Sequence, residues 1–199
     1  MRTFPLVSSL VLALAAALPS AAQEAPAMSA EEKAMMEAYQ QAGTPGPQHA
    51  AMARSAGDYT LSVTSWQAPD APPTVESGKA RRRMDLGGRV LIEEVESTMM
   101  GQAFTGMGLH GYDNVSGKYW STWNDSMSTG LMVSQGDCDD QGNCTFTGSW
   151  NDPVTRDKVT ARMTTRWTDA NTEIFEMYGP GPDGKEMKMM QITYTRTNP

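Results

Sequence analysis

The chain has 199 residues, a formal net charge of −7 and 39% hydrophobic residues, which predicts one soluble globular domain rather than a disordered chain. The acidic balance argues against a nucleic-acid binder and against a polybasic membrane-binding surface, because both need clustered positive charge. Methionine is abundant at 16 residues, whereas only 2 cysteines and 2 histidines exclude most Cys/His metal sites and most Ser-His or Cys-His catalytic sets.

Residues 1–22 have the pattern of a secretory signal peptide. A basic residue precedes an apolar stretch, and a proline and three small residues follow it (MRTFPLVSSLVLALAAALPSAA). We therefore expect cleavage before Gln23 and a periplasmic or secreted protein, the alternative being an uncleaved anchor. No second apolar run follows, so no membrane insertion of the mature chain is expected.

Residues 23–57 are predicted to form a helical segment ahead of the main domain. Ser29 and Glu32 have the spacing of a capping box, which predicts a helix that begins there and ends at Gly43. Residues 48–55 predict a second, shorter helix.

From residue 58 to residue 199 the hydrophobic pattern has the period of two that is typical of strands. Strand-like runs occur at 58–67, 75–86, 89–98, 103–112, 118–127, 130–138, 144–151, 158–168, 172–178 and 185–197. No stretch between them is long enough for the crossover helix of a parallel sheet. The pattern predicts an all-β antiparallel fold, a closed barrel or a sandwich, and we favour a barrel of about ten strands.

Cys138 and Cys144 flank a five-residue turn between two of these runs. Antiparallel pairing would place them opposite each other, near the separation that a disulfide requires. In an exported protein this spacing predicts a disulfide that staples a hairpin rather than a redox centre.

Gly87 and Gly88 predict a tight turn that fixes the register of one hairpin. The pairs that follow on one face are Met84 with Leu91, Arg82 with Glu93, and Ala80 with Val95. This face is apolar apart from Arg82 and Glu93, so it is the better candidate for the interior, where an ion pair is often functional or fixes the register. With the two faces exchanged, the pair would lie in solvent, and the pattern leaves both arrangements open.

The next hairpin, around residues 114–117, predicts a similar interior face. Its expected members are Met107, Leu109, Trp123 and Met127, with Asp125 among them. Paired-carboxylate chemistry by Glu93 and Asp125 depends on a geometry that the sequence does not define.

Residues 106–111 match the pattern G-x-G-x-x-G, but they lead into a Trp-rich strand instead of a helix, which excludes the dinucleotide-binding interpretation. The glycines are better explained as room for large neighbours such as Trp120 or Trp123.

Metal and cofactor sites find little support in the sequence. Residues 137–142 resemble the start of a calcium loop, but the twelfth position is Gly148 rather than glutamate. The methionine doublets invite a copper(I) site, yet neighbouring strand residues point to opposite faces, so we interpret these residues as adaptable apolar lining. A surface position is one interpretation of either His49 or His110, and His110 alternates with glycines on a strand; no metal or cofactor is predicted.

Several stretches of the chain resemble one bacterial family. They are MMEAY (35–39), GTPGP (43–47) with His49, LGGR (86–89), EE (93–94), MGQ (100–102), GYDN (111–114), STWNDSMSTG (121–130), FEMY (175–178), GPDGK (181–185), KMM (188–190) and TYTR (193–196). The family is domain-of-unknown-function 1579 (DUF1579), and the resemblance covers nearly all of the chain after the leader. It carries no established activity and implies a lipocalin-like antiparallel barrel.

Lipocalin-like barrels often open with Gly-x-Trp and close with an arginine that packs over that tryptophan. Gly57, Tyr59 and Arg196 resemble this arrangement, with tyrosine in the tryptophan position. His110 and the cysteine pair depart from the family pattern. A haem site like that of nitrobindin barrels needs an axial histidine, and neither His49 nor His110 is placed as one by the resemblance.

Three hypotheses for function follow. The first is a barrel that binds a small, apolar or amphipathic molecule, with no nucleic-acid partner. The residues expected to bind it are Trp66, Arg82, Glu93, Met107, Leu109, Trp123, Asp125 and Met127. The second is an enzyme in which Glu93 or Asp125 acts as acid or base on a small ligand. The third is a structural or stress-related envelope protein whose barrel is filled by its own side chains.

Overall fold

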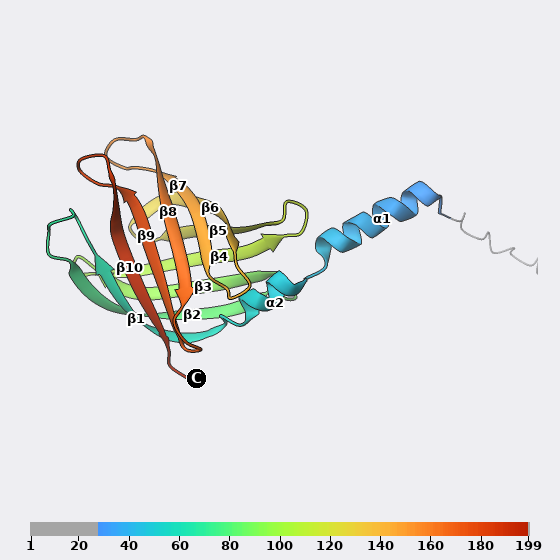
Figure 1. The fold of residues 1–199 in the computed structure, drawn as a ribbon, viewed down its shortest axis with the longest axis horizontal. Helices are drawn as coiled ribbons and strands as arrows, with labels where there is room; N and C mark the ends of the chain where they lie inside the picture. The colour runs from blue at the N-terminus through green and yellow to red at the C-terminus, as the bar shows by residue number, and fades with distance from the viewer. Residues whose placement is uncertain (1–27, 199) are drawn as a thin grey trace, which may run out of the picture.

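The computed structural model describes residues 28–198 and consists of a ten-stranded barrel preceded by two helices (Figure 1). The predicted signal peptide at residues 1–22 lies outside the described residues. The helices are α1 (Ala30–Gly43) and α2 (Pro47–Ala53). The strands are β1 (Gly57–Ser65), β2 (Thr74–Asp85), β3 (Val90–Met99), β4 (Gln102–Asp113), β5 (Lys118–Asp125), β6 (Ser128–Cys138), β7 (Cys144–Asn151), β8 (Lys158–Trp167), β9 (Thr172–Pro180) and β10 (Glu186–Arg196).

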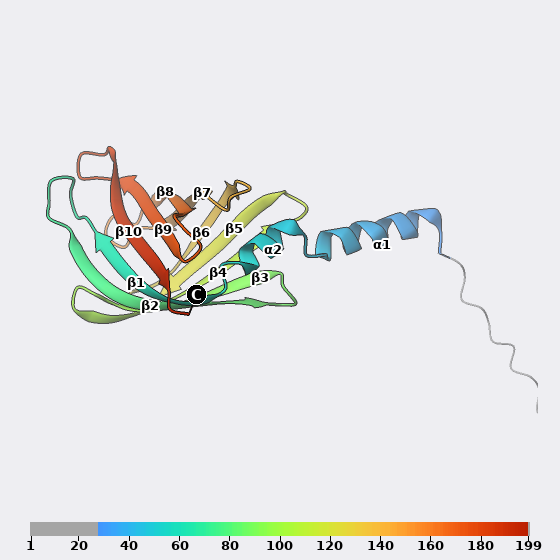
Figure 2. The same ribbon diagram turned by 60° about the horizontal axis from the view of Figure 1, so that its bottom comes forward.

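The strands form a closed antiparallel barrel, which confirms the predicted fold class. Each strand pairs with the next along the chain, and β1 also pairs with β10, so that Tyr59 lies opposite Arg196. The turned view of Figure 2 shows the first and last strands side by side. Closure leaves every strand with two hydrogen-bonded neighbours and removes the exposed edges of an open sheet.

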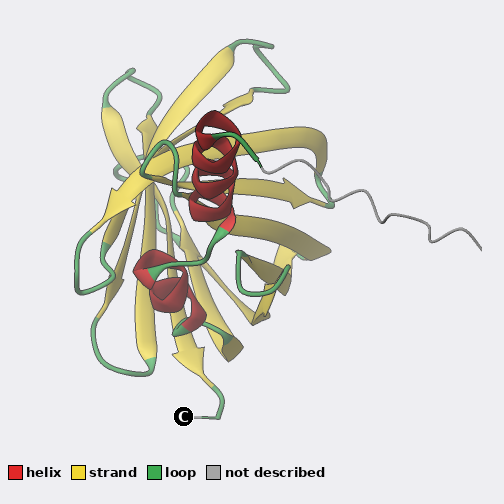
Figure 3. Cartoon of the chain, turned by 90° about the vertical axis from the view of Figure 1, so that its right-hand side faces the viewer, coloured by secondary structure: helices red, strands yellow, loops and turns green. Residues whose placement is uncertain are grey.

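The two helices lie outside the barrel wall and differ in their packing. The capping box of Ser29 and Glu32 is present at the start of α1, which points away from the barrel and buries none of its residues (Figure 2). α2 lies across one end of the barrel (Figure 3). No helix among the described residues is long and apolar enough to cross a membrane.

His49 lies on α2 and is buried, which excludes the surface position that the sequence left open for this residue. Its Nδ1 accepts a hydrogen bond of 3.0 Å from the backbone N–H of Gly46, and its ring packs edge-on against Tyr112 of β4. These contacts give His49 a structural role in holding α2 against the barrel.

The β2–β3 hairpin has the register that the glycine pair predicts. Arg82 pairs with Glu93, and the turn residues Gly87 and Gly88 adopt φ values of 64° and 85° that favour glycine. The face that carries Arg82 and Glu93 is buried together with Ala80, Leu91 and Val95. The hairpin therefore points this ion pair into the barrel.

The prediction that Met107 and Leu109 share this interior face is wrong. Glu93 pairs with Gly108, so the inward positions of β4 are Phe104, Gly106, Gly108 and His110. Met107 points outward and is 50% exposed. The alternation of the strand thus places Met107 and Leu109 outside and puts Gly106 and Gly108 inside, between Phe104 and His110.

Large rings occupy the space that the glycines of β4 leave. A Cβ atom on Gly106 would lie 2.2 Å from Cζ2 of Trp123, and one on Gly111 would lie 2.2 Å from Cζ2 of Trp120. This confirms the interpretation of the glycine pattern as room for tryptophan, because any side chain at these positions would collide with the rings.

Two further contacts tie the barrel together. Cys138 and Cys144 are paired across the β6–β7 hairpin and form the predicted disulfide. Arg196 packs its guanidinium 5.1 Å from the ring centre of the fully buried Tyr59. It also donates a hydrogen bond of 2.7 Å to the carbonyl oxygen of Ala56, at the end of the segment that contains α2.

Candidate functional site

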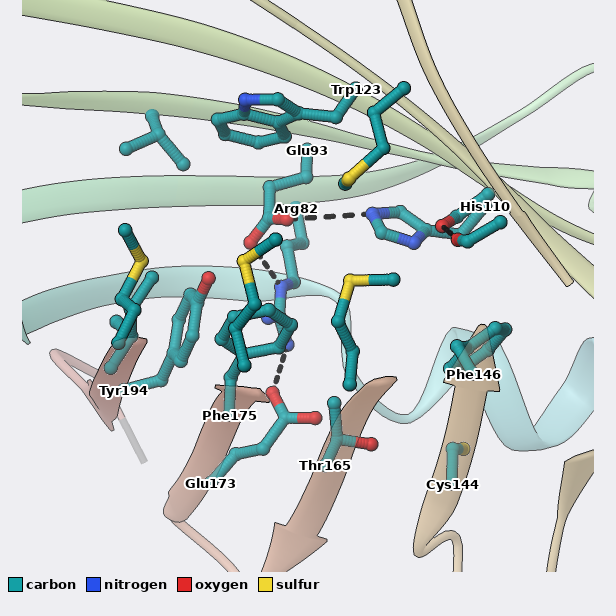
Figure 4. Close-up of a pocket in the computed structure, with 18 of the residues that line it drawn as sticks. Arg82, Glu93, His110, Trp123, Cys144, Phe146, Thr165, Glu173, Phe175 and Tyr194 are labelled. Carbon is teal, nitrogen blue, oxygen red and sulfur yellow. Dashed lines mark hydrogen bonds and ion pairs between the residues drawn. The ribbon is translucent and has the colours of Figure 1, made fainter. Parts of the chain in front are cut away.

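A cavity of about 860 Å³ occupies the interior of the barrel (Figure 4). It reaches α2 at one end, where Ala51 and Met52 contribute to its lining, and extends to Asp125 and Met127 at the other. Its volume falls in the range of about 300–1,000 Å³ that is typical of small-molecule sites. The hypothesis of a barrel filled by its own side chains is therefore wrong.

The walls of the cavity are mainly apolar and aromatic. Trp123 stacks on Phe104 with 6.5 Å between ring centres, and Phe146 and Phe175 line the cavity from other strands. Methionines from several strands complete the lining: Met99, Met132, Met163, Met177 and Met190. Such side chains adapt readily to the shape of a bound molecule.

The predicted site residues divide into two groups. Arg82, Glu93, Trp123, Asp125 and Met127 line the cavity, whereas Met107, Leu109 and Trp66 are not among the residues that line it. The ring of Trp66 instead lies 5.3 Å from the Lys188 ammonium.

A charged cluster lies within this mostly apolar lining, towards the end that α2 covers. Arg82 donates a hydrogen bond of 2.8 Å from Nε to Oε1 of Glu93 and a second one from Nη1 to Oε2 of Glu173 on β9. All three side chains are at most 8% exposed. One buried guanidinium thus faces two buried carboxylates, a combination that is stable only with close hydrogen-bonded pairing.

Two tyrosine rings cover the Arg82 guanidinium. Its Cζ lies 5.2 Å from the ring centre of Tyr59 and 4.2 Å from that of Tyr194, within the range of cation–π attraction. Burial, and after it the negative charge of Glu93, raises the pKa of Tyr194 well above its usual range, although the Arg82 charge acts in the opposite direction. The tyrosine therefore stays neutral and acts as packing for the cation.

Glu93 is a fixed anion in this arrangement. Burial acts to raise its pKa, but the Arg82 charge and the contacts with Arg82 and His110 outweigh burial and hold the pKa at about 2. A carboxyl that stays ionised across the physiological range neither donates a proton nor accepts one readily, which opposes the acid–base role considered from the sequence.

Asp125 is also engaged in hydrogen bonds. It accepts one of 3.0 Å from the indole N–H of Trp123 and one of 2.9 Å from the backbone N–H of Met127. These bonds orient the Trp123 ring over the cavity and shape the end of the barrel opposite α2.

His110 points into the cavity and brings an unsatisfied nitrogen to the cluster (Figure 4). Its Nε2 lies 3.4 Å from Oε2 of Glu93 but is buried without a hydrogen-bond partner among the described residues. The ring folds over Gly108, where a Cβ atom would lie 2.9 Å from this nitrogen. A buried nitrogen without a partner is uncommon, and here it lies beside a cavity that can hold one.

Sequence reasoning missed Glu173 and did not assign His110 to the interior. Glu173 lies 91 residues from Arg82, so no single turn relates the two positions. The placement of His110 follows from the register of β3 and β4, because Leu91 lies opposite it on the inward face. The alternation of Gly106, Gly108 and His110 was therefore the available signal.

Metal binding finds no ready set of ligands here. Within residues 28–198 no group of three or more His, Cys, Asp and Glu side chains is arranged to hold a metal ion. Arg82 occupies the position between Glu93 and Glu173 that a cation between these carboxylates would take.

Comparison with known proteins identifies the family of the chain. The family model described as "Protein of unknown function (DUF1579)" matches residues 44–196, which is most of the chain. The chain belongs to the DUF1579 family. The match begins just before α2 of this DUF1579 member and ends with β10.

The barrel of this DUF1579 member also resembles solved structures. The crystal structure of Rv2717c from M. tuberculosis has a TM-score of 0.62 and 11% sequence identity, and the match covers 78% of this chain and 100% of that one. At this identity the likeness concerns the fold alone. A comparison with curated proteins gives no match.

Proposed function

We propose that this DUF1579 protein is an exported barrel that binds a small, partly apolar molecule in its lumen. The observation that carries the proposal is the cavity of about 860 Å³, with apolar and aromatic walls and one charged cluster. Sites of this kind use apolar walls for affinity and a few polar groups for orientation. Arg82, Glu93, Trp123, Asp125 and Met127 would contact the ligand.

The buried charges also support binding rather than catalysis. Glu93 and Glu173 are neutralised in part by Arg82, and the hydrogen bonds hold the three groups as a rigid unit in which Glu93 stays ionised near neutral pH. A rigid polar unit beside an adaptable apolar wall orients a ligand without transferring a proton to it.

Native mass spectrometry of the protein purified from its own periplasm tests the proposal. We expect a mass adduct that dissociates as a small molecule on activation. Titration of apolar probes should also change the fluorescence of Trp123, whose ring lines the cavity. Absence of both an adduct and a fluorescence change would count against ligand binding.

A matched pair of variants locates the binding site. Thr165 lines the cavity, so Thr165→Phe places a ring inside it and should lower the affinity for every probe. Thr164 is the preceding residue of β8 and, by strand alternation, lies on the outer face. Thr164→Phe should therefore bind as the wild type does, and equal effects of the two changes would place binding elsewhere.

Export is part of the same proposal. The sequence pattern of residues 1–22 and the disulfide between Cys138 and Cys144 support an oxidising compartment. Mass analysis of the mature N-terminus should give Gln23 as the first residue, and a protein that retains residues 1–22 would contradict export by cleavage.

A further inference from the structure

We infer that the ligand of the cavity carries a cationic, hydrogen-bond-donating head group, such as a primary ammonium, on an apolar body. The inference rests on the proposed function and adds the chemical class of the ligand. Its basis is the balance of charge and of free hydrogen-bond acceptors around the lumen.

The cavity is acidic although its walls are mainly apolar. Three arginines and six carboxylates line it; without the exposed Arg54, Asp139 and Asp169, two arginines and four carboxylates leave a formal surplus of two negative charges when His110 is neutral. Walls of low polarity concentrate the field of such charges within the enclosed space. A cation in the lumen is therefore favoured over a neutral group, and an anion is disfavoured.

Arg82 and Arg196, two arginines that line the lumen, already donate hydrogen bonds to groups of the protein. Arg82 lies between Glu93 and Glu173 and beneath the rings of Tyr59 and Tyr194, so the place that a ligand carboxylate would take is filled by protein carboxylates. Arg196 donates to the carbonyl oxygens of Ala56 and Arg54.

Arg196 also packs over the rings of Tyr59 and Trp167. Arg54, the third arginine of the lining, is exposed at the α2 end of the barrel.

Acceptors beside Arg82 remain free for a donor. Arg82 uses only Oε2 of Glu173, and Oε1 of that carboxylate accepts no hydrogen bond from the described residues (Figure 4). On the other side of the guanidinium, Oε2 of Glu93 faces the unpartnered Nε2 of His110 at 3.4 Å. An ammonium group, with three N–H donors and no acceptor, matches these two carboxylate oxygens, Oε1 of Glu173 and Oε2 of Glu93.

The aromatic walls match the same class of ligand. Trp123 and Phe104 present stacked rings to the lumen, and Asp125 holds the Trp123 indole in place. Aromatic faces attract cations and also pack against apolar chains, so they accommodate both parts of an alkylammonium ion.

Three probes that share one alkyl chain test the inference: dodecylamine, dodecanol and dodecanoate, each below its micelle concentration at pH 7. We expect the amine to bind the wild-type protein at least about tenfold more tightly than either of the others, because charge-assisted hydrogen bonds are about twice as strong as neutral ones. Calorimetry and tryptophan fluorescence measure the three affinities.

The outcomes separate the inference from the proposed function. Dodecanol or dodecanoate binding as tightly as the amine would overturn the cationic head group and leave a lipophilic binding barrel. Failure of all three probes to bind would contradict the proposed function as well.

A variant pair adds a second readout. Glu173→Gln should lower the affinity for dodecylamine by about tenfold and leave that for dodecanol within about twofold, since only the amine loses a charged partner. Glu93→Gln makes the same change at the other carboxylate beside Arg82 and serves if Glu173→Gln does not fold. An unchanged amine preference in both variants would overturn the assignment.

Discussion

Replacement of Arg82 by methionine should destabilise the barrel by about 3–5 kcal/mol at neutral pH, because it leaves two buried carboxylates without their shared partner. The wild-type structure gives a similar value for this loss of stability. The pKa of Glu93 falls from 4.5 to about 2 on folding, which corresponds to about 3 kcal/mol of stability above pH 4.5. Loss of the cation–π contacts with Tyr59 and Tyr194 adds to this amount.

Lowering the pH changes the contribution of Glu93 to folding stability in opposite directions in the wild type and in Arg82→Met. In the wild type the folded-state pKa of Glu93 is depressed, so its contribution is present above about pH 4.5 and is lost as the pH falls towards 2. In Arg82→Met, burial without the cation raises the pKa of Glu93, so acidification neutralises an unpaired buried charge. The gap in stability between the two proteins should therefore narrow as the pH falls from 7 to about 3.

Urea unfolding followed by tryptophan fluorescence and circular dichroism measures both effects. The triple variant Arg82→Met, Glu93→Leu, Glu173→Leu is the control, because an apolar triad of similar volume often matches a buried ionic one in stability. We expect it to recover most of the loss. An Arg82→Met variant whose free energy of unfolding falls by less than about 1 kcal/mol would refute this reasoning, and so would a triple variant as unstable as Arg82→Met.

Three further predictions concern the barrel wall and its closed end. Replacing Cys138 and Cys144 by serine should cost about 2 kcal/mol, as expected for a short closed loop, and reductant should have no further effect on that variant. Gly106→Ala should cost about 1–3 kcal/mol and shift tryptophan emission, because its Cβ would lie 2.2 Å from the Trp123 ring; a thermal transition equal to the wild type would contradict the collision. Arg196→Ala removes the hydrogen bond to Ala56 and should speed hydrogen exchange in α2, while unchanged exchange there would show that other contacts hold the helix.

The fold and part of the site could be predicted because short-range rules govern them. Two glycines define the β2–β3 turn, and the turn sets the register that pairs Arg82 with Glu93. The alternation along these strands makes the more apolar face the better candidate for the interior but leaves the exchanged arrangement open, and the structure buries the apolar face.

The rest of the cluster depends on contacts that no local rule describes. Glu173 lies on β9, three strands away from the β2 strand of Arg82 around the barrel. The two side chains therefore meet only when β1 pairs with β10 and the barrel closes. On β4 the usual rule of apolar residues inside fails, because the Trp123 ring fills the interior and requires glycine beneath it. Met107 is consequently exposed, and His110 takes the inward position.

The cluster also has a consequence for the order of folding. Arg82 and Glu93 are 11 residues apart within one hairpin, so they can pair after a short loop closure. Glu173 is 91 residues from Arg82, and such distant contacts form late. The early hairpin therefore carries a balanced charge pair, and the second carboxylate arrives as β1 meets β10. Glu173 thus completes the buried cluster in the final step of assembly, after the Arg82–Glu93 pair has formed.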